Sequence, residues 1–359
     1  AKCFTPGFCQ QSLALLMAFV ASTEAVESSE TGGRIGFITD CEGNFEYWKS
    51  CVDLSAVVGW DSNGDLVFLN DHNRDAFVFG GDVFDKGPGD LRIARQLIAF
   101  KRRCPERVWL LAGNRDINKL RLTAELNESD LDVPQPVPLY PRAPPQVPLR
   151  AFLEKRQVEE AIISIDEVNT RANRLRWILD HTMTAGGAFE LRRQELALLE
   201  GMEVAKIDDE AVVQSFLKSV DEDGVVFEYL KESVLLAPVG PYLFVHGGIP
   251  KDAIRWIPSM QMRYLSPAEG DTCEGTKLPP SCGFHEWVNE MNSFFQSGLK
   301  DFRSQPLWRK DRSRGGEALL CLTSTPACFR RSVVVESLLE GGMPTSLYPE
   351  VVEFLQSGG

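Results

Sequence analysis

The stretch Gly81-Asp82-Val83-Phe84-Asp85-Lys86-Gly87 directly follows Ala76–Phe79, an apolar run with the length and composition of a buried strand. A second stretch of the same kind, Thr39-Asp40-Cys41-Glu42-Gly43-Asn44, follows the apolar run Ile35–Ile38. In both stretches, acidic side chains come where the chain would turn out of a sheet. The glycines beside them allow the tight backbone turns that such a loop needs.

Two more stretches repeat this design further along the chain. Ala112-Gly113-Asn114-Arg115-Asp116 follows the apolar run Val108–Leu111, and Leu243-Phe244-Val245-His246-Gly247-Gly248 carries a histidine after its own apolar run. We expect these polar side chains to meet at one edge of a sheet, where binding sites of open sheets usually lie. Carboxylate and amide oxygens together with one imidazole are suitable ligands for divalent metals. The sequence therefore predicts a metal site.

Strands and helices alternate between residues 34 and 130. Helices are predicted at Glu46–Val58 and at Asp90–Arg103, the second because an aspartate after Gly-Pro-Gly is a helix-start signal. Trp60–Asn70 has turn residues at its centre and predicts a small hairpin. This alternation favours an α/β fold with parallel strands at the centre of its sheet.

The pattern changes after residue 130. Residues 132–148 contain seven prolines, which exclude a regular helix or sheet. The helices predicted beyond this loop are Phe152–Leu179, Phe189–Leu199, Asp209–Val220, Glu286–Asp301 and Pro349–Gln356. The strands predicted there are Val225–Leu230, Val234–Ala237, Tyr242–Val245 and Ser332–Val335.

Four segments follow from this pattern. Residues 1–33 are a tail, in which the apolar run Leu13–Val20 is too short to span a membrane and indicates either a trimmed targeting segment or an N-terminal helix. Residues 34–130 and 237–359 are the two halves of the main domain. Residues 131–236 are a Pro-rich loop and a helical insertion, which we expect to cover the sheet edge or to bind a protein partner.

The bulk composition limits the classes of function. A net charge of −13 argues against non-specific nucleic-acid binding, and no stretch is long and apolar enough to span a membrane. The nine cysteines form no CxxC pair, and their irregular spacing favours reduced thiols in an intracellular or organellar compartment. Cys273/Cys282 and Cys321/Cys328 are candidate disulfide pairs only if the protein is exported, which the reduced-thiol pattern does not favour.

The four stretches, in this order, resemble the motifs of the calcineurin-like metallophosphoesterases, and most of all those of the phosphoprotein-phosphatase and diadenosine-tetraphosphatase branch. The resemblance covers about residues 34–130 and 237–340. It implies an α/β/β/α sandwich of the metallophosphoesterase type, here with a helical insertion. It also implies hydrolysis of a phosphate ester by attack of a metal-bound hydroxide.

The same resemblance assigns roles to individual residues. Two divalent ions would lie side by side, the first held by Asp40 and Glu42 and the second by Asn114 and His246, with Asp82 as the bridge. Mn or Mg is favoured over Fe or Zn, because the ligand set is rich in oxygen. The implied substrates are a phosphorylated small molecule, a dinucleoside polyphosphate or a phosphoprotein.

This chain departs from the family pattern at three places. Glu42 stands where the family has a metal-binding histidine, and Arg115 stands where it has the histidine that protonates the leaving group. The last family histidine has no counterpart, since Val333-Val334-Val335 is followed by Glu336-Ser337 and no histidine follows His285.

Two interpretations of these departures stay open. In the first, the site is rebuilt: Lys86 and Arg115 contact the phosphate, Glu42 and Glu336 serve as ligands, and Asp116 or water protonates the leaving group. Arg115 could equally pair with Asp85 or Asp116 as a structural ion pair. In the second interpretation, catalysis has been lost and the protein acts as an interaction or assembly subunit. A further alternative is a metal- or nucleotide-binding regulator that keeps one ion and has no turnover.

Overall fold

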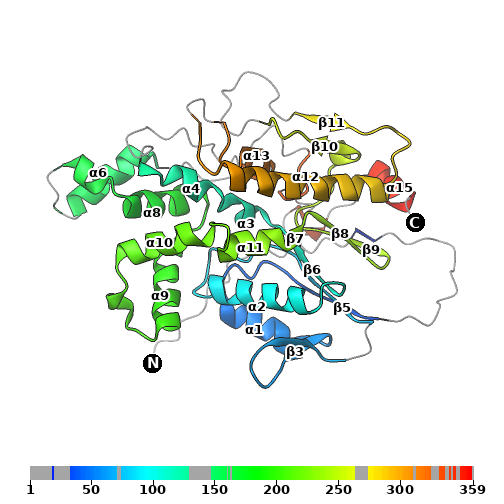
Figure 1. Ribbon diagram of the computed structural model, residues 1–359, viewed down its shortest axis with the longest axis horizontal. Helices are drawn as coiled ribbons and strands as arrows, with labels where there is room; N and C mark the ends of the chain where they lie inside the picture. The colour runs from blue at the N-terminus through cyan, green and yellow to red at the C-terminus, as the bar shows by residue number, and fades with distance from the viewer. Residues whose placement is uncertain are drawn as a thin grey trace.

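The protein is described by a computed structural model that covers residues 18–19, 33–70, 74–128, 147–159, 161, 164–262, 274–309, 313–324, 331–335, 339–340, 343–344 and 348–357. Two sheets lie between layers of helices, with α12 on one side and α1 and α2 on the other (Figure 1). This is the expected α/β/β/α arrangement.

The first sheet has four parallel strands in the order β2-β5-β6-β7. Their bounds are β2 Ile35–Ile38, β5 Ala76–Phe79, β6 Val108–Leu111 and β7 Ser233–Val234. All four residues of β5 are buried, because the strand is covered on both faces. This explains why its sequence is a continuous apolar run rather than an alternating one.

The second sheet is antiparallel, with the order β1-β9-β8. Its strands are β1 Ala18–Phe19, β8 Leu236–Val239 and β9 Tyr242–Val245. The two sheets pack face to face through a small apolar cluster to which Val78 and Leu111 of the first sheet and Phe244 of the second contribute. Because β7 ends at Val234 and β8 begins at Leu236, the chain passes from one sheet to the other within the predicted strand Val234–Ala237.

Helices cover the outer faces of both sheets. On the first sheet, the ring of Phe77 packs against Phe100 of α2 and the ring of Phe79 against Tyr229 of α11. On the second sheet, Asn292 of α12 accepts from the backbone of Leu236 and donates to its carbonyl. The helices of these layers are α1 Phe45–Leu54, α2 Asp90–Arg103, α3 Asn114–Asn118, α11 Val225–Lys231, α12 Phe284–Ser304, α13 Glu317–Ser324 and α15 Pro349–Gln356.

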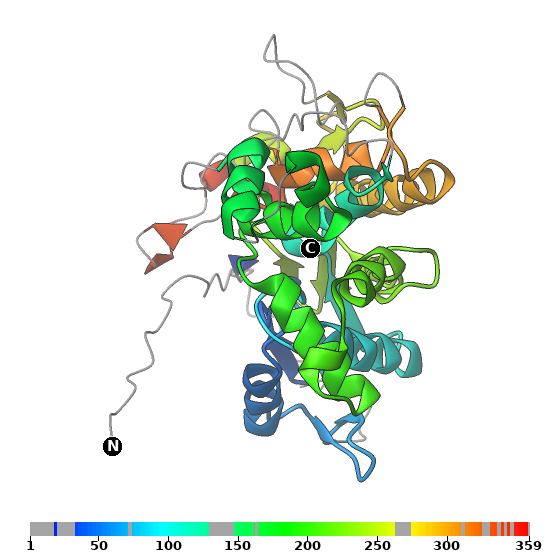
Figure 2. The same cartoon turned by 90° about the vertical axis from the view of Figure 1, so that its left-hand side faces the viewer.

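The helical insertion has an apolar core of its own, in which Trp177, Phe189 and Phe216 are buried. Its helices and the preceding α4 are α4 Arg121–Glu125, α6 Leu149–Glu159, α7 Ile165–Val168, α8 Arg171–Thr182, α9 Ala188–Glu200, η1 Val204–Lys206 and α10 Asp209–Ser219. In Figure 2 these green helices face the viewer and lie along one end of the two sheets.

Short elements complete the fold. The hairpin predicted at Trp60–Asn70 is present as β3 Val58–Trp60 and β4 Leu66–Phe68. The remaining elements are η2 Lys251–Ala253, β10 Trp256–Pro258, β11 Gly275–Lys277, β12 Leu339–Glu340 and β13 Met343–Pro344. Within the described part of the chain, none of the helices has the length and apolar character needed to cross a membrane.

Two strand predictions were wrong. Val225–Leu230 is α11, a helix, because its β-branched and aromatic residues bury one helical face through Val226, Tyr229 and Leu230. Ser332–Val335 forms a turn, in which the carbonyl of Val333 accepts a hydrogen bond from the backbone N–H of Gly247. That turn therefore supports the loop that follows β9.

Two helix predictions also needed correction. The stretch Phe152–Leu179 contains three separate helices, α6, α7 and α8. The hydroxyls of Ser164 and Thr170 accept from backbone N–H groups at the starts of α7 and α8, and such side-chain caps fix where a helix begins. Within the run Leu13–Val20, the described residues Ala18 and Phe19 form a strand and not a helix.

Candidate metal centre

The carboxyl ends of β2, β5, β6 and β9 bring Asp40, Asp82, Asn114 and His246 to one place at the sheet edge. Ligand atoms of Asp40, Asp82 and His246 all lie within 4.8 Å of one another. The amide oxygen of Asn114 is 3.1 Å from Nε2 of His246. The predicted site residues of these four strands thus converge.

Several acids of the site have a backbone conformation that glycine normally adopts. The φ angles of Asp40, Glu42, Asp82 and Asp85 are 52°, 44°, 55° and 116°. Non-glycine residues rarely adopt positive φ, and such strain is concentrated at functional sites. The loops are held in this form by hydrogen bonds from Asp40 N to Gly81 O (3.1 Å) and from Glu42 N to Asp82 O (3.0 Å).

The imidazole of His246 is oriented by the backbone. Its Nδ1 is 2.7 Å from the carbonyl of Gly80, which makes Nδ1 the donor and directs Nε2 toward the centre. Nε2 lies 3.3 Å from Asp82 Oδ1 and 3.1 Å from Asn114 Oδ1. A nitrogen surrounded by oxygen acceptors must either carry a proton or bind a cation, so this donor set fits one divalent ion.

The pKa values of these residues also indicate that the cluster of oxygens needs a positive charge at its centre. Burial lowers the pKa of His246, but the carboxylates of Asp82 and Asp40 outweigh it and raise this pKa to about 10. Burial also raises the pKa of Asp82, but the His246 imidazolium and Arg115 lower it to about 2. Burial raises the pKa of Asp40 to about 6. Without a metal, the proton on His246 supplies the positive charge that these oxygens require.

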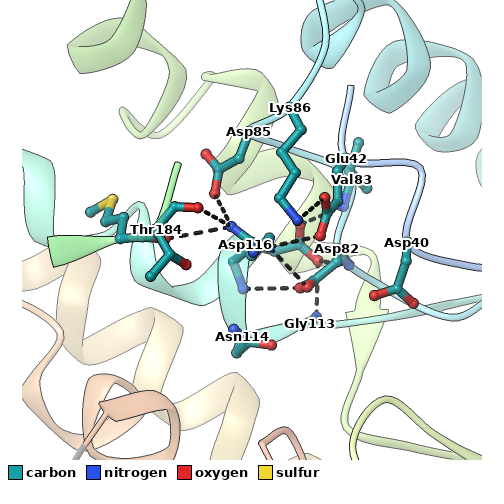
Figure 3. A network of polar contacts seen from close by, with 12 residues as sticks. Asp40, Glu42, Asp82, Val83, Asp85, Lys86, Gly113, Asn114, Asp116 and Thr184 are labelled. Atoms are coloured by element: carbon teal, nitrogen blue, oxygen red, sulfur yellow. Dashed lines mark hydrogen bonds and ion pairs between the residues drawn. The ribbon is translucent and has the colours of Figure 1, made fainter. Parts of the chain in front are cut away.

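Glu42 is not among the three residues whose ligand atoms cluster, and its carboxylate pairs instead with two cations of the chain. Its Oε1 is 2.9 Å from Nε of Arg115, and its Oε2 is 2.5 Å from Nζ of Lys86 (Figure 3). The Arg115 side chain is 13% exposed and that of Lys86 is 39% exposed. Lys86 can therefore reach a ligand in solvent far more easily than Arg115 can.

Asp85 pairs with the other end of Arg115. Its Oδ2 is 3.3 Å from Nη1 of Arg115, and its Oδ1 is 2.6 Å from the ammonium of Lys119. Asp85 and Lys119 are both 1% exposed. Lys119 was not among the predicted site residues. Its only signal in the sequence is the spacing of four residues from Arg115, which places both on one side of a short helix.

Asp116 lies behind the centre and holds its backbone. Its Oδ1 accepts from the backbone N–H of Val83 at 2.8 Å, and its Oδ2 accepts from those of Asp82 and Gly113 at 2.9 Å each. It is fully buried, and burial raises its pKa to about 7. Both oxygens face backbone amides, an arrangement that joins the β5 and β6 loops rather than one that meets a substrate. Glu336 lies outside the described residues.

Gly81 makes the close approach of these loops possible. Its φ is +96°, and a Cβ added there would lie 2.8 Å from the backbone nitrogen of Gly113 and 2.8 Å from Nδ1 of His246. A side chain at this position would separate the two strands that carry Asn114 and His246.

Comparison with known proteins supports the family resemblance. The model of the calcineurin-like phosphoesterase family matches residues 33–184, the part of the chain that carries the first three motifs. No curated protein matches the sequence. The resemblance to the calcineurin-like metallophosphoesterases is thus confirmed, and the chain has a metallophosphoesterase fold.

One solved structure is similar at low identity. It is a protein serine/threonine phosphatase from Saccharomyces cerevisiae with similarity to human phosphatase PP5, with 10% sequence identity and a TM-score of 0.27. The similarity covers 75% of this chain and 49% of that one, so the chain spans about half the length of the structure it matches.

Proposed function

We propose that this protein is a metal-dependent phosphoesterase whose divalent ion is held by Asp40, Asp82, Asn114 and His246. The observation that carries the proposal is the convergence of Asp40, Asp82 and His246 within 4.8 Å, on a loop framework with strained backbone. Three oxygen donors and one imidazole suit Mn²⁺ or Mg²⁺. Such an ion supplies Lewis-acid polarisation of a phosphoryl oxygen.

The charge balance of the site favours an anionic ligand only after metal binding. Apart from Asp116, whose oxygens are taken by backbone amides, four carboxylates face three fixed cations, so these groups carry one net negative charge when His246 is neutral. A divalent ion changes the balance to one net positive charge, which attracts a phosphate. The groups counted are Asp40, Glu42, Asp82 and Asp85 against Lys86, Arg115 and Lys119.

Lys86 is the residue of the chain best placed to hold the phosphate. It is the most exposed cation of the site, and its Nζ reaches Glu42 Oε2. An ammonium on a flexible stem can exchange that carboxylate for a phosphoryl oxygen at little cost. Arg115, by contrast, is largely buried among acceptors, and we assign it a structural role rather than direct contact with the phosphate.

The substrate class follows from the missing general acid. Arg115 does not release a proton near neutral pH, and Asp116 is surrounded by backbone amides. With Lys86 assigned to the phosphate, neither Arg115 nor Asp116 is left to protonate a leaving oxygen. We propose substrates whose leaving group is weakly basic, such as a phosphoanhydride in a dinucleoside polyphosphate or an aryl phosphate, ahead of an alkyl phosphate such as phosphoserine.

A second candidate function is a non-catalytic subunit of this fold. The observation that favours it is the position of Arg115, which binds Glu42, Asp82 and Asp85 at once. In that case the site would hold an ion or a phosphate without turnover, and the helical insertion would provide the binding surface.

The test combines metal binding with turnover. Wild type, Asp82→Asn and the control Asp53→Asn, an exposed residue paired with Lys49, would be titrated with Mn²⁺ by calorimetry. The same proteins would be assayed on p-nitrophenyl phosphate and a dinucleoside polyphosphate. We expect binding and hydrolysis in wild type and control, and loss of both in Asp82→Asn. Binding without hydrolysis would support the non-catalytic candidate, and equal behaviour of all three proteins would refute the metal site.

A further inference from the structure

The carboxylate of Glu42 decides whether the site can hold two metal ions or only one. The family resemblance assigns the first ion to Asp40 and Glu42, with Asp82 as the bridge to the second ion. Both oxygens of Glu42 are engaged by cations of the chain, Oε1 by Arg115 Nε at 2.9 Å and Oε2 by Lys86 Nζ at 2.5 Å. Glu42 is 7% exposed, so solvent does not compete strongly with these pairs. An ion bound here would have to displace two positive groups.

Arg115 is anchored along its whole length beside Asp82. Its backbone N–H donates to Asp82 Oδ1 at 2.9 Å, and its Nε lies 3.5 Å from Asp82 Oδ2. Its Nη1 lies 3.3 Å from Asp85 Oδ2. The guanidinium therefore stands between the carboxylates of Glu42 and Asp82, which is where an ion shared by these two residues would lie.

The helical insertion contributes to this anchoring. Nη1 of Arg115 donates to the backbone carbonyls of Met183 and Thr184, each at 3.4 Å (Figure 3). Both carbonyls follow α8, about seventy residues further along the chain. Thr184 has a φ of 52°, in the left-handed region that non-glycine residues rarely adopt. A guanidinium held by carboxylates on one side and carbonyls on the other has a fixed position and a permanent charge.

We infer that Arg115 replaces the first metal ion of the two-metal arrangement, so that each chain binds one divalent ion and not two. Asp82 is then a terminal ligand of that ion and an ion-pair partner of Arg115, instead of a bridge between two metals. A second divalent ion a few ångströms from Arg115 and Lys86 would be repelled by both. The inference extends the proposed function, because it fixes the metal content of the same site.

The first measurement is the metal content of the wild-type protein. The chain would be equilibrated with Mn²⁺, and bound metal would be counted by elemental analysis and by native mass spectrometry. We expect one ion per chain, with the six-line electron paramagnetic resonance spectrum of an isolated Mn²⁺ and no exchange-coupled pair. Two ions with a coupled spectrum would overturn the inference and leave the proposed function standing.

Variants test the role of the two cations. Arg115→Gln combined with Lys86→Gln frees both oxygens of Glu42, and we expect this double variant to bind a second Mn²⁺. Arg95→Gln, at an exposed position on α2, is the matched control and keeps one ion. A folded double variant that still binds one ion would contradict the inference. One ion without turnover would refute the hydrolase and leave the inference intact, whereas no bound ion in wild type would refute both.

Discussion

The backbone N–H of Leu91 donates to the carboxylate of Glu195 at 2.9 Å, across 104 residues of sequence. Arg92 N–H donates to the same carboxylate at 3.0 Å. Leu91 and Arg92 are in the first turn of α2, where N–H groups lack helical partners. Glu195 belongs to α9 of the insertion and is fully buried. The insertion therefore caps the helix that follows the Asp82–Gly87 loop.

This cap extends to the site through Asp90. Oδ2 of Asp90 is 3.1 Å from Nη2 of Arg192, which lies beside Glu195 on α9. Oδ1 of Asp90 accepts from the backbone N–H of Asp85 at 3.0 Å. Contacts with Arg115 on one side and with Asp90 on the other thus connect the insertion to the metal centre at two points.

Glu195→Gln is expected to destabilise the protein by about 1–3 kcal/mol, because it removes a buried charge that satisfies backbone donors and faces Arg192. The midpoint of unfolding in urea measures this change. Glu200→Gln changes an exposed residue at the end of the same helix and should shift the stability by less than about 0.5 kcal/mol. Equal shifts in the two variants would show that Glu195 does not act as a cap.

Gly81→Ala and Gly64→Ala form a matched pair that separates backbone strain from crowding. Both glycines have positive φ, +96° and +80°, so an alanine at either costs about 1–2 kcal/mol of backbone strain. Only at Gly81 does the new methyl group meet other atoms, those of Gly113 and His246.

Because the methyl group displaces His246 from the carbonyl of Gly80, Gly81→Ala should weaken Mn²⁺ binding by roughly 10- to 100-fold. Gly64→Ala should leave the affinity unchanged. Calorimetric titration of both variants provides the measurement, and unchanged binding in Gly81→Ala would show that His246 is not a ligand.

The stability of the helical insertion should depend on pH through the carboxylate of Asp209. This residue begins α10 and pairs with Arg176 of α8 at 2.8 Å and with Arg193 of α9. The hydrogen bonds from Arg176 are the largest cause that lowers its pKa, to about 2 from 3.8. A lowered pKa in the folded state means that the stabilisation is fully present above pH 4 and is lost as the pH falls toward 2.

Asp209→Asn should therefore lower the stability of the insertion at neutral pH, by less than about 1 kcal/mol because the side chain is half exposed. The difference between wild type and variant should stay constant above pH 5 and disappear between pH 4 and 2. The midpoint of unfolding in urea, measured for both proteins across this pH range, provides the test. A difference that does not change with pH would contradict the assignment.

Much of the central fold could be predicted from the sequence. The strands β2, β5, β6 and β9 and the helix α2 have the predicted bounds, because each is an apolar run or an amphipathic segment with clear ends. The segment Val225–Leu230 was misjudged because its residues favour strands, whereas its contacts with α2 bury one helical face.

The candidate metal centre was predictable only in part, for a physical reason. Asp40, Asp82, Asn114 and His246 lie directly after strands, so the topology alone brings them together. The position of Arg115 depends on the conformation of a long side chain and on the carbonyls of Met183 and Thr184 in a distant helical turn. Motif spacing contains no information about such contacts.

On the proposed function, the rate of hydrolysis should depend steeply on the leaving group, because the family resemblance puts the permanently charged Arg115 at the position of the general acid. Arg115 donates hydrogen bonds but keeps its protons, so the leaving oxygen must depart with its negative charge or be protonated by water. Loss of a general acid costs roughly a hundred- to ten-thousand-fold for a basic leaving group and little for a weakly basic one.

We therefore expect p-nitrophenyl phosphate and dinucleoside polyphosphates to be hydrolysed at least about a hundred times faster than an alkyl phosphate or a phosphoserine peptide. A plot of log kcat/KM against leaving-group pKa, over a series of substituted phenyl phosphates, measures this dependence as a negative slope. A flat plot would mean that a proton donor does act on the leaving group, and it would contradict this prediction.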